Sequence, residues 1–420
     1  MTMTPRIVII GGGFGGLAAA KALAHAPAEV VLIDRQNHHL FQPLLYQVAT
    51  AALSPADIAW PIRRILRHQS NAQVLMAEVT GIDIERKQVL MGTRAEPYDY
   101  LVIASGATHA YFGHDDWAPY APGLKQIIDA TDIRRRILMA FERAEKESEP
   151  SAREKLLTIV IVGGGPTGVE MAGAISELTR KALAADFRRI DPRKTRVVLI
   201  ETGRKLLPSF PEPLSGYAKQ ALENLGVEVR VGAPVTHCGA DGVRLGDERI
   251  DAVTIIWAAG VAASPAADWL RVTKDRVGRV VVGPRLEVGD RDGAFVIGDA
   301  ALVENPQGHA LPGIASVAKQ QGVYVGKLIA ARIQGKPDPK PFHYRNAGQL
   351  ATIGRHTAVV DMGMLRIRGR LAWWFWGLVH IYFLINLRSR LTVAIQWLWS
   401  YFTFDRGARL ITGDRQRLRR

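Results

Sequence analysis

The chain has 420 residues, of which 48% are hydrophobic and 22% are charged, a composition typical of about two or three globular domains. Disordered chains, collagens and coiled-coil rods are excluded by this composition. The single cysteine, Cys238, excludes a disulfide framework, a four-cysteine metal site and an internal redox disulfide. The formal net charge of +14 favours an anionic partner, which can be an anionic cofactor, an acidic lipid surface or a nucleic acid.

The first elements predict a βαβ unit. A β-rich run over 6–10 leads into a glycine cluster, and an alanine-rich helix over 17–25 and a second strand over 29–33 follow. The apolar run at the start is four residues long, whereas a secretory signal needs about 7–15 apolar residues. We therefore expect the chain in the cytosol or on the cytosolic side of a membrane.

The glycine cluster fits the pattern G-x-G-x-x-G with Gly11, Gly13 and Gly16. In this motif the first glycine makes a tight turn, the second lets a pyrophosphate approach the backbone, and the third lets the helix lie close to the strand. The N-terminus of the helix then faces the phosphates with free N–H groups. Asp34 follows 18 residues after Gly16, at the end of the second strand, where an acid can hold ribose hydroxyls. These features predict a dinucleotide site.

The same order of elements returns about 150 residues later. The sequence predicts a strand over 158–162, a glycine cluster at 163–168 and a helix over 169–185. A second strand over 196–200 follows and ends at an acid, Glu201. Gly163, Gly165 and Gly168 take the three motif positions. The chain thus contains two dinucleotide-binding units.

Glu201 indicates which nicotinamide nucleotide the second unit prefers. A carboxylate at the strand end accepts a hydrogen bond from a ribose 2′-hydroxyl and repels a 2′-phosphate, which favours NAD over NADP. Arg204 and Lys205 lie close by in the sequence and weaken this inference.

Two dinucleotide units suggest a flavin that stays bound and a nicotinamide that comes and goes, with hydride transfer between them. A strand over 294–297 ends at Gly298-Asp299, where the acid can accept hydrogen bonds from ribityl hydroxyls. Two further strands end in turns of small residues, within 100–107 and 255–261.

The C-terminal part has a different character. The run 371–387 contains no Asp, Glu, Lys or Arg over 17 residues, and a second apolar and aromatic run covers 391–404. Because a spanning helix needs about 20 residues, we predict two interfacial helices rather than a transmembrane hairpin. A buried helix pair at a dimer interface is the alternative.

The charge of this part supports the interfacial interpretation. From Arg366 to Arg420 the chain has eleven arginines and two acids, a net charge of +9, together with five of the nine tryptophans. Arginine interleaved with tryptophan is typical of a membrane interface more than of a nucleic-acid patch.

Together the two glycine motifs, the Ala104-Ser-Gly-Ala turn, the Trp257-Ala-Ala-Gly turn and Gly298-Asp299 resemble the flavoproteins with two dinucleotide-binding domains. Within that group the chain resembles the type II NADH dehydrogenases, which are single-subunit NADH:quinone oxidoreductases that pump no protons. The resemblance covers nearly the whole chain. It rests on GGGPTGVEMAGA over 163–174, LATIG over 350–354 and the stretch from Leu371 to Gly413, of which the last is the most specific.

The resemblance implies an α/β fold with two Rossmann-like dinucleotide-binding domains and a membrane-associated helical segment at the C-terminus. The implied divisions are an FAD domain at 1–120 and 265–345, an inserted NAD(H) domain at 121–264 and the C-terminal segment at 346–420. It implies FAD as cofactor, NADH as substrate and a membrane quinone, ubiquinone or menaquinone, as acceptor. It also implies a peripheral protein on the cytoplasmic face of the inner membrane, in contact with anionic lipids, and leaves a homodimer open.

By this resemblance, FAD would contact Gly11, Gly13, Gly16, Asp34, Val79 and Asp299, and NADH would contact Gly163, Gly165, Gly168 and Glu201. Further cofactor contacts are expected at Gly12, Phe14, Gly15, Arg35, His39, Ala104, Gly106, Gly260, Ala318 and Lys319. We expect no metal site, since His38 and His39 have no carboxylate or cysteine at metal-ligand spacing.

Two residues are candidates for catalysis. Glu170 matches a family glutamate on the nicotinamide side of the flavin, although an acid in the first turn of a helix can simply complement the helix dipole. The family also has a quinone-site helix of the form Ala-Gln-x-Ala-x-Gln-Gln. In this chain Ser316 replaces the first glutamine, while Gln320 and Gln321 remain, so the quinone contacts stay open.

Two alternative functions stay open. A soluble NADH-dependent reductase for an electron-transfer protein such as ferredoxin would use the same chemistry, but the aromatic and basic C-terminus argues against it. A flavoprotein redox sensor with a nucleic-acid-binding tail would show salt-sensitive DNA binding. We expect no nucleic-acid partner. Cys238 lies outside the region where disulfide, sulfide or peroxide reductases of this fold need cysteines, and we expect it to be an inert small hydrophobe.

Overall fold

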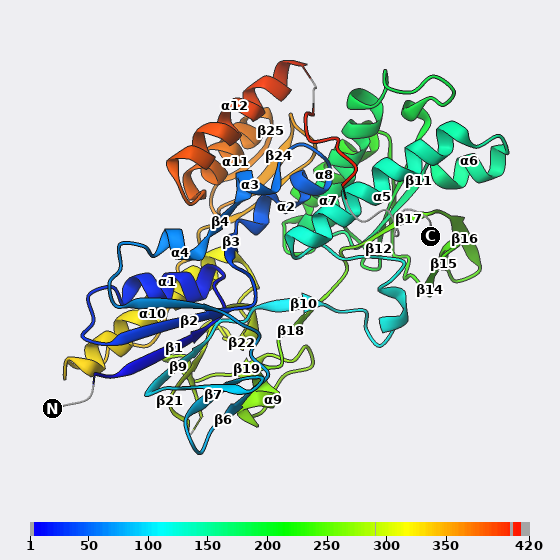
Figure 1. Ribbon diagram of the computed structural model, residues 1–420. Coiled ribbons are helices and arrows are strands. Elements are labelled where there is room, and N and C mark those ends of the chain that lie inside the picture. The colour runs from blue at the N-terminus through cyan, green and yellow to red at the C-terminus, as the bar shows by residue number, and fades with distance from the viewer. Residues whose placement is uncertain (1–3, 290, 404–405, 413–420) are drawn as a thin grey trace. The chain divides into compact units, whose positions relative to one another are not determined.

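The computed structural model describes residues 4–289, 291–403 and 406–412. The chain forms two compact units, each assembled from segments that are far apart in the sequence (Figure 1). Unit 1 consists of Met1–Leu40, Ala59–Thr108 and Val261–Asn346, and unit 2 consists of Phe41–Ile58, His109–Gly260 and Ala347–Arg420. Phe404, Asp405 and Gly413, which belong to the C-terminal stretch that carries the family resemblance, lie outside the described residues.

The core of unit 1 is a six-stranded sheet with strand order β20-β21-β9-β1-β2-β5. Its central strand, β1, is apolar after Arg6 and almost fully buried, as expected for a parallel strand covered on both faces. The strands are β1 (Arg6–Ile10), β2 (Glu29–Asp34), β5 (Ala72–Met76), β9 (Tyr100–Ile103), β20 (Glu287–Val288) and β21 (Arg291–Val296).

Two helices of unit 1, α1 (Phe14–Ala22) and α10 (Ala315–Ile333), pack against each other at very short range. A Cβ atom on Gly322 would lie 2.1 Å from the carbonyl oxygen of Gly15, so only glycine allows this approach. Helix α1, which begins at the first glycine motif, is therefore packed against α10, a helix about 300 residues later in the sequence.

Unit 2 contains a four-stranded parallel sheet with strand order β13-β12-β11-β17. Its strands are β11 (Thr158–Val162), β12 (Arg196–Glu201), β13 (Val227–Val231) and β17 (Thr254–Trp257). Its main helices are α5 (Ile127–Lys146), α7 (Pro166–Glu177) and α8 (Glu212–Asn224). The predicted repeat is confirmed, because β1 lies between β2 and β9 just as β11 lies between β12 and β17.

The helix predicted at 169–185 is shorter in the structure. The α-helical part, α7, ends at Glu177, and a π-helical turn, η3 (Leu178–Ala182), follows it. Such turns interrupt regular helices and are frequent near functional sites.

The C-terminal part of unit 2 has a three-stranded antiparallel sheet of β23 (Gln349–Thr352), β24 (Ala358–Asp361) and β25 (Arg366–Gly369). Two helices follow, α11 (Arg370–Phe383) and α12 (Leu387–Thr403), which confirms the predicted helix pair. No helix in the part of the chain that the structure describes has both the length and the apolar character needed to cross a bilayer.

Cys238 lies in β14 (His237–Gly239) and is 1% exposed within a cluster of apolar side chains. Burial raises the pKa of this thiol to about 11, which keeps it neutral and unreactive. The burial of Cys238 is in keeping with the predicted structural role.

Candidate active site

The first glycine motif forms a tight loop between β1 and α1. Gly11 has φ +102°, and a Cβ atom there would lie 2.3 Å from the carbonyl oxygen of Ala104. A Cβ atom on Gly16 would lie 1.9 Å from the oxygen of Gly11. At Gly13, the N-cap of α1, a Cβ atom would meet nothing within 4 Å. The loop is thus crowded on the protein side and open above the helix N-terminus, where a phosphate would bind.

Two side chains fix the shape of this loop. Asp34 accepts a hydrogen bond from the backbone N–H of Gly12 at 2.5 Å and a second from Gln36 at 2.6 Å. His39 is buried, and burial lowers its pKa to about 4, so the ring is neutral and its Nδ1–H donates to the Gly12 oxygen at 2.8 Å. Phe14 meets the His39 ring edge-to-face at 5.0 Å. In the structure His39 therefore stabilises the backbone of the glycine loop at Gly12.

Unit 1 also has a cavity of about 180 Å³, which contains Asp299 in its wall. Gln321 is 1% exposed and accepts a hydrogen bond from the backbone N–H of Gly298 at 2.6 Å. A Cβ atom on Gly313 would lie 3.2 Å from the carboxylate of Asp299. A cavity with a carboxylate at a strand end and glycines beside it fits the ribityl chain and ring of a flavin, as the open loop fits its pyrophosphate.

The other residues predicted for cofactor binding in unit 1 lie at different depths. Ala104 follows β9 and donates its N–H to Ile10 at 2.7 Å, and Gly106 has φ +71° with open space above it. Val79 is half-buried at the edge of the core, Ala318 is buried in α10, and Arg35 and Lys319 are exposed.

Gln320 is held by the backbone of a neighbouring segment. Its Nε2 donates to the carbonyl oxygen of Arg345 at 2.9 Å, and its Oε1 accepts from the Arg345 N–H at 3.0 Å. Ser316, at the position of the missing family glutamine, is hydrogen-bonded to the hydroxyl of Tyr344 at 3.0 Å. These two bonds fix the orientation of the Gln320 amide and leave one N–H and one oxygen lone pair for a further partner.

The second glycine motif repeats the geometry of the first. Gly163 has φ +111°, and a Cβ atom there would lie 2.5 Å from the backbone of Ala258. A Cβ atom on Gly168 would lie 1.8 Å from the Gly163 oxygen, while Gly165, the N-cap of α7, faces open space. The N-terminus of α7 is thus prepared for a second pyrophosphate.

Glu201 takes the position in unit 2 that Asp34 has in unit 1. Its two oxygens accept hydrogen bonds from the backbone N–H groups of Gly164 and Gly203, each at 2.6 Å. Lys205 is turned away, because its Nζ donates to the carbonyl oxygen of Phe210 at 2.8 Å. Gly260, after β17, accepts a bond from Ala110 at 3.2 Å. The structure therefore removes Lys205 as an argument for a 2′-phosphate site.

Glu170 lies in the second turn of α7, and its side chain is partly buried. Burial raises the pKa of its carboxyl to about 8, and a long hydrogen bond of 3.4 Å from the backbone N–H of Thr352 opposes that shift only weakly. Near neutral pH this carboxyl is mostly protonated, so it can give up a proton and take one back. Complementing the helix dipole requires a carboxylate, which this environment disfavours.

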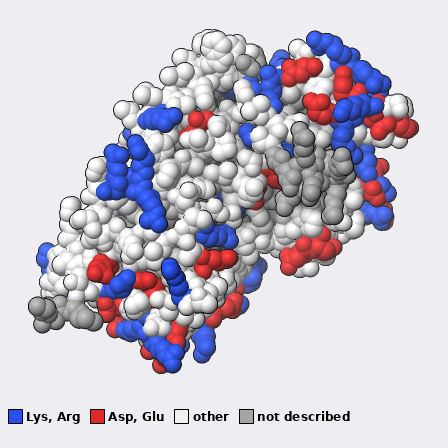
Figure 2. All heavy atoms as spheres, viewed as in Figure 1, with Lys and Arg blue, Asp and Glu red and all other residues white. Residues whose placement is uncertain are grey.

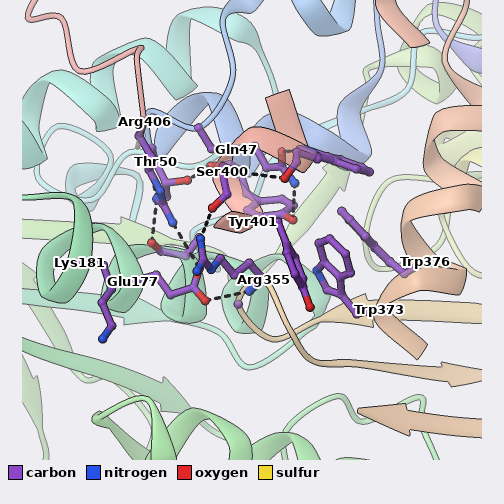
Figure 3. Close-up of a pocket in the computed structure, with 15 residues that line it drawn as sticks. Gln47, Thr50, Glu177, Lys181, Arg355, Trp373, Trp376, Ser400, Tyr401 and Arg406 are labelled. Atoms are coloured by element: carbon purple, nitrogen blue, oxygen red, sulfur yellow. Dashed lines mark hydrogen bonds and ion pairs between the residues drawn. The ribbon is translucent and has the colours of Figure 1, made fainter. Parts of the chain in front are cut away.

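A second cavity, which we name the aromatic cavity, lies within unit 2 and has a volume of about 70 Å³. Figure 3 shows aromatic side chains from α11 and α12 on one side of it and charged side chains on the other. Trp376 and Trp397 stack with ring centroids 5.0 Å apart. Its lining includes Tyr46, Gln47, Glu177, Arg355, Arg406 and the two tryptophans.

Arg406 closes the charged side of this cavity. Its guanidinium is buried and donates to the carbonyl oxygens of Thr50 at 2.9 Å and Ala174 at 3.0 Å, and it lies 3.4 Å from Glu177. Glu177 also accepts a hydrogen bond from the backbone N–H of Arg355 at 2.8 Å. Burial raises the pKa of Glu177, whereas the two arginines lower it.

The aromatic cavity is not predicted by the sequence. Glu177 follows Glu170 by seven residues, which places both on one face of a helix, and this spacing is a signal that sequence reasoning could have used. Tyr46, Gln47 and Arg406 carry no comparable signal, because they meet only through the tertiary fold.

Comparisons with known proteins agree with this fold. A family model described as pyridine nucleotide-disulphide oxidoreductase matches residues 5–322, and one described as NDH2 C-terminal domain matches residues 346–406. A solved structure of NDH2 from Plasmodium falciparum in complex with NADH has a TM-score of 0.87 at 22% identity and covers 98% of this chain and all of that chain. That likeness supports the fold.

Two curated relatives from Mycobacterium tuberculosis are similar over almost their full length. The type II NADH:quinone oxidoreductase Ndh is 43% identical and NdhA is 44% identical, each over 97% of this chain and 90% of the relative. The chain therefore belongs to the type II NADH:quinone oxidoreductases, within the pyridine nucleotide-disulphide oxidoreductase family.

Proposed function

We propose that the protein oxidises NADH with FAD as cofactor and transfers two electrons to a membrane quinone without pumping protons. The observation that carries the proposal is the duplicated glycine loop, in which a strand-end acid is hydrogen-bonded to the loop in each unit: Asp34 to Gly12 and Glu201 to Gly164. Two such loops provide for two dinucleotides, and hydride transfer is the chemistry that uses both.

The residues of each unit have separate tasks in this proposal. In unit 1 the loop around Gly13 would hold the FAD pyrophosphate, and Asp34 and Asp299 would hold its ribose and ribityl hydroxyls. In unit 2 the loop around Gly165 would hold the NADH pyrophosphate, and Glu201 would hold a ribose hydroxyl. FAD, when bound, supplies a ring that accepts a hydride and releases two electrons.

The C-terminal helices support a membrane-bound acceptor. Leu371, Trp374, Leu378 and Tyr382 recur at helical spacing along α11, and each is more than half exposed. Leu387, Leu391, Ile395, Leu398 and Phe402 form a similar exposed stripe on α12, and Figure 2 shows few charged side chains in this region. Such stripes lie in the headgroup region of a bilayer.

These stripes support a location at a membrane surface. We propose peripheral association with the cytoplasmic face of the membrane, with the arginines between and beside the helices adding about 1 kcal/mol each at an anionic surface. The competing use of the same apolar face, contact with a second copy of the chain, predicts a dimer whose formation protects the face from vesicles.

The test is a product assay with three acceptors. The purified FAD-loaded protein is given NADH with a short-chain ubiquinone, with a menaquinone analogue and with a ferredoxin. One quinol formed for each NADH consumed, with no ferredoxin reduction, is the expected result. Fast reduction of ferredoxin with neither quinone reduced would overturn the proposal in favour of a soluble reductase.

A further inference from the structure

The orientation of the Gln47 amide determines whether the hydroxyl of Tyr46 donates or accepts in the hydrogen bond between them. Both residues lie in α2 (Leu45–Ala49). The indole Nε1 of Trp397 donates to Gln47 Oε1 at 2.7 Å, and an indole nitrogen can only donate. The Gln47 orientation is therefore fixed, and its Nε2 must donate to the Tyr46 oxygen at 2.8 Å. The tyrosine oxygen is the acceptor in this contact, so the phenolic proton is not used in it.

No acceptor for that proton lies within hydrogen-bonding distance among the described residues. Tyr46 is 6% exposed, and its side chain forms part of the wall of the aromatic cavity. A buried hydroxyl with an unused proton usually finds a partner, in protein, water or ligand. Here the available space beside it is the cavity.

The helix α7 lies against α2 and carries Glu170 and Glu177, the carboxyl groups that can return a proton to Tyr46. Burial raises the pKa of Tyr46 well above its ordinary value; Glu170 and Glu177 raise it further, and the Gln47 hydrogen bond and Arg406 lower it. Tyr46 is thus protonated at neutral pH, as is most of Glu170, whose pKa is about 8. The phenol of Tyr46 belongs to the cavity wall, and the carboxylic acid of Glu170 lies on the neighbouring helix α7.

The remaining cavity wall suits a flat molecule with oxygen acceptors. The indole Nε1 of Trp376, which is 1% exposed, has no hydrogen-bond partner among the described residues. The stacked Trp376 and Trp397 rings provide a flat apolar surface, and Arg355 and Arg406 provide positive charge. Buried cations stabilise the negative charge that develops on a carbonyl oxygen during reduction.

We propose that Tyr46 is a catalytic residue that donates a proton to an oxygen of the quinone, held in the aromatic cavity. This inference rests on the proposed function. NADH brings two electrons and one proton, and the quinol needs a second proton. In this step the Tyr46 O–H bond breaks as a quinone O–H bond forms. A proton from Glu170 then reaches the phenolate through a bridging water molecule, and solvent reprotonates Glu170.

The size of the cavity limits the way in which the quinone enters. About 70 Å³ is well below the roughly 300–1,000 Å³ of sites that enclose whole ligands. The proposal therefore has one edge of the headgroup lying beside the stacked tryptophans in the cavity, while the isoprenoid tail stays outside.

The test compares Tyr46→Phe with the wild-type holoenzyme in two separate half-reactions. NADH should reduce the flavin of the variant at the wild-type rate. Reoxidation by a short-chain quinone should slow by about 10²-fold or more, the usual contribution of a general acid. The wild-type reoxidation should slow in D₂O, and the variant should lose that isotope effect.

A second variant and a binding readout make the test independent of this one substitution. In Gln47→Glu, a carboxylate would accept from both Trp397 and Tyr46, so the proton would be captured and reoxidation should slow in the same way. Quinone binding to the oxidised holoenzyme, read by quenching of tryptophan fluorescence, should weaken by no more than about tenfold in Tyr46→Phe.

The control is Tyr111→Phe, which removes a buried hydroxyl that donates to the Ala121 oxygen at 2.8 Å outside the cavity. It should leave reoxidation and the isotope effect unchanged. Wild-type reoxidation in both test variants, or a complete loss of quinone binding in Tyr46→Phe, would overturn the inference. Failure of the wild-type enzyme to be reoxidised by any quinone would instead overturn the proposed function.

Discussion

Glu201 accepts a hydrogen bond from the backbone N–H of Gly164 at 2.6 Å, and Asp34 makes the equivalent contact with Gly12 at 2.5 Å. In each unit the acid thus shapes the glycine loop, and we propose that it also binds the ribose of the nucleotide. A hydrogen bond to a charged group contributes about 1.5–3 kcal/mol, so these contacts hold the acid in a fixed position.

Glu201→Gln should weaken discrimination between the two nicotinamide nucleotides. The amide keeps an oxygen for one backbone contact, so kcat/KM for NADH should fall about tenfold. It loses the charge that repels a 2′-phosphate, so the ratio of kcat/KM for NADH to kcat/KM for NADPH should fall by more than that. Steady-state kinetics with both nucleotides measures this ratio. Glu212→Gln, on α8, is the control. An unchanged ratio would contradict the assignment of Glu201.

The third glycine of each motif should affect one cofactor only. In Gly16→Ala the new Cβ would lie 1.9 Å from the Gly11 oxygen, and in Gly168→Ala it would lie 1.8 Å from the Gly163 oxygen. The first variant should be purified without FAD, and the second should keep FAD but bind NADH more than about tenfold more weakly. Flavin absorbance and NADH titration measure the two effects.

Gly216→Ala is the matched control for this pair, since its Cβ would meet nothing within 4 Å. It should keep both cofactors and gain about 0.5–1 kcal/mol of stability from helix propensity. Loss of FAD in Gly168→Ala would contradict the separation of the two sites.

Glu170 should make stability fall as pH rises. Its pKa is about 8 in the folded state, against an ordinary value of 4.5, so the folded protein binds more protons than the unfolded chain between these values. This contribution is complete below pH 4.5 and is lost through pH 8, a change on the order of 5 kcal/mol. Glu170→Gln should remove that slope in urea unfolding curves, whereas Glu223→Gln should not.

The same variant tests the role of Glu170 in turnover. If Glu170 only fills space, Glu170→Gln will keep wild-type NADH:quinone turnover at every pH. We expect slower quinone reduction and a pH profile without the step near pH 8.

His39 should act in the opposite direction at acidic pH. Its pKa of about 4 in the folded state lies below the ordinary 6.5, so the unfolded chain binds more protons between these values and stability is lost as pH falls through that range. His39→Asn keeps an N–H donor for the Gly12 oxygen without the titration and should flatten the acid side of the stability profile. An exposed histidine, His25, gives the control variant His25→Asn. Equal slopes in both variants would contradict the role of His39.

The exposed stripe on α11 should determine membrane binding. Trp374→Glu and Leu378→Glu place charges on residues that are 54% and 69% exposed, so folding should be unaffected while sedimentation with anionic vesicles drops about tenfold. Thermal unfolding checks the fold. Binding that is unchanged in the double variant, together with loss of a dimer, would assign the stripe to a second copy of the chain.

The sequence was sufficient to predict the duplicated βαβ units, because the glycines and the strand-end acids act within about 40 residues of chain. The exposed apolar stripes follow in the same way from helical spacing on α11 and α12. The sequence was not sufficient to predict the aromatic cavity, where the hydrogen-bonded residues Gln47 and Trp397 are 350 positions apart. Contacts of that separation follow from packing, for which a single sequence has no local signal.

The end of α7 shows a second limit. The sequence 169–185 has uniform helical character, yet the regular helix stops at Glu177 and a π-helical turn follows. Arg406 donates to the Ala174 oxygen near that point, and Arg409 donates to the Ala182 oxygen at 2.7 Å. Tertiary partners that satisfy these carbonyls let the turn open, and propensity alone does not predict this.

The most direct test of the central claim is an anaerobic stopped-flow experiment on the FAD-loaded protein, read at the flavin absorbance band. NADH should bleach the band rapidly, NADPH slowly or not at all, and a short-chain quinone added afterwards should restore it. Bleaching by NADH without recovery on addition of any quinone would contradict the account and assign the electrons to a different acceptor.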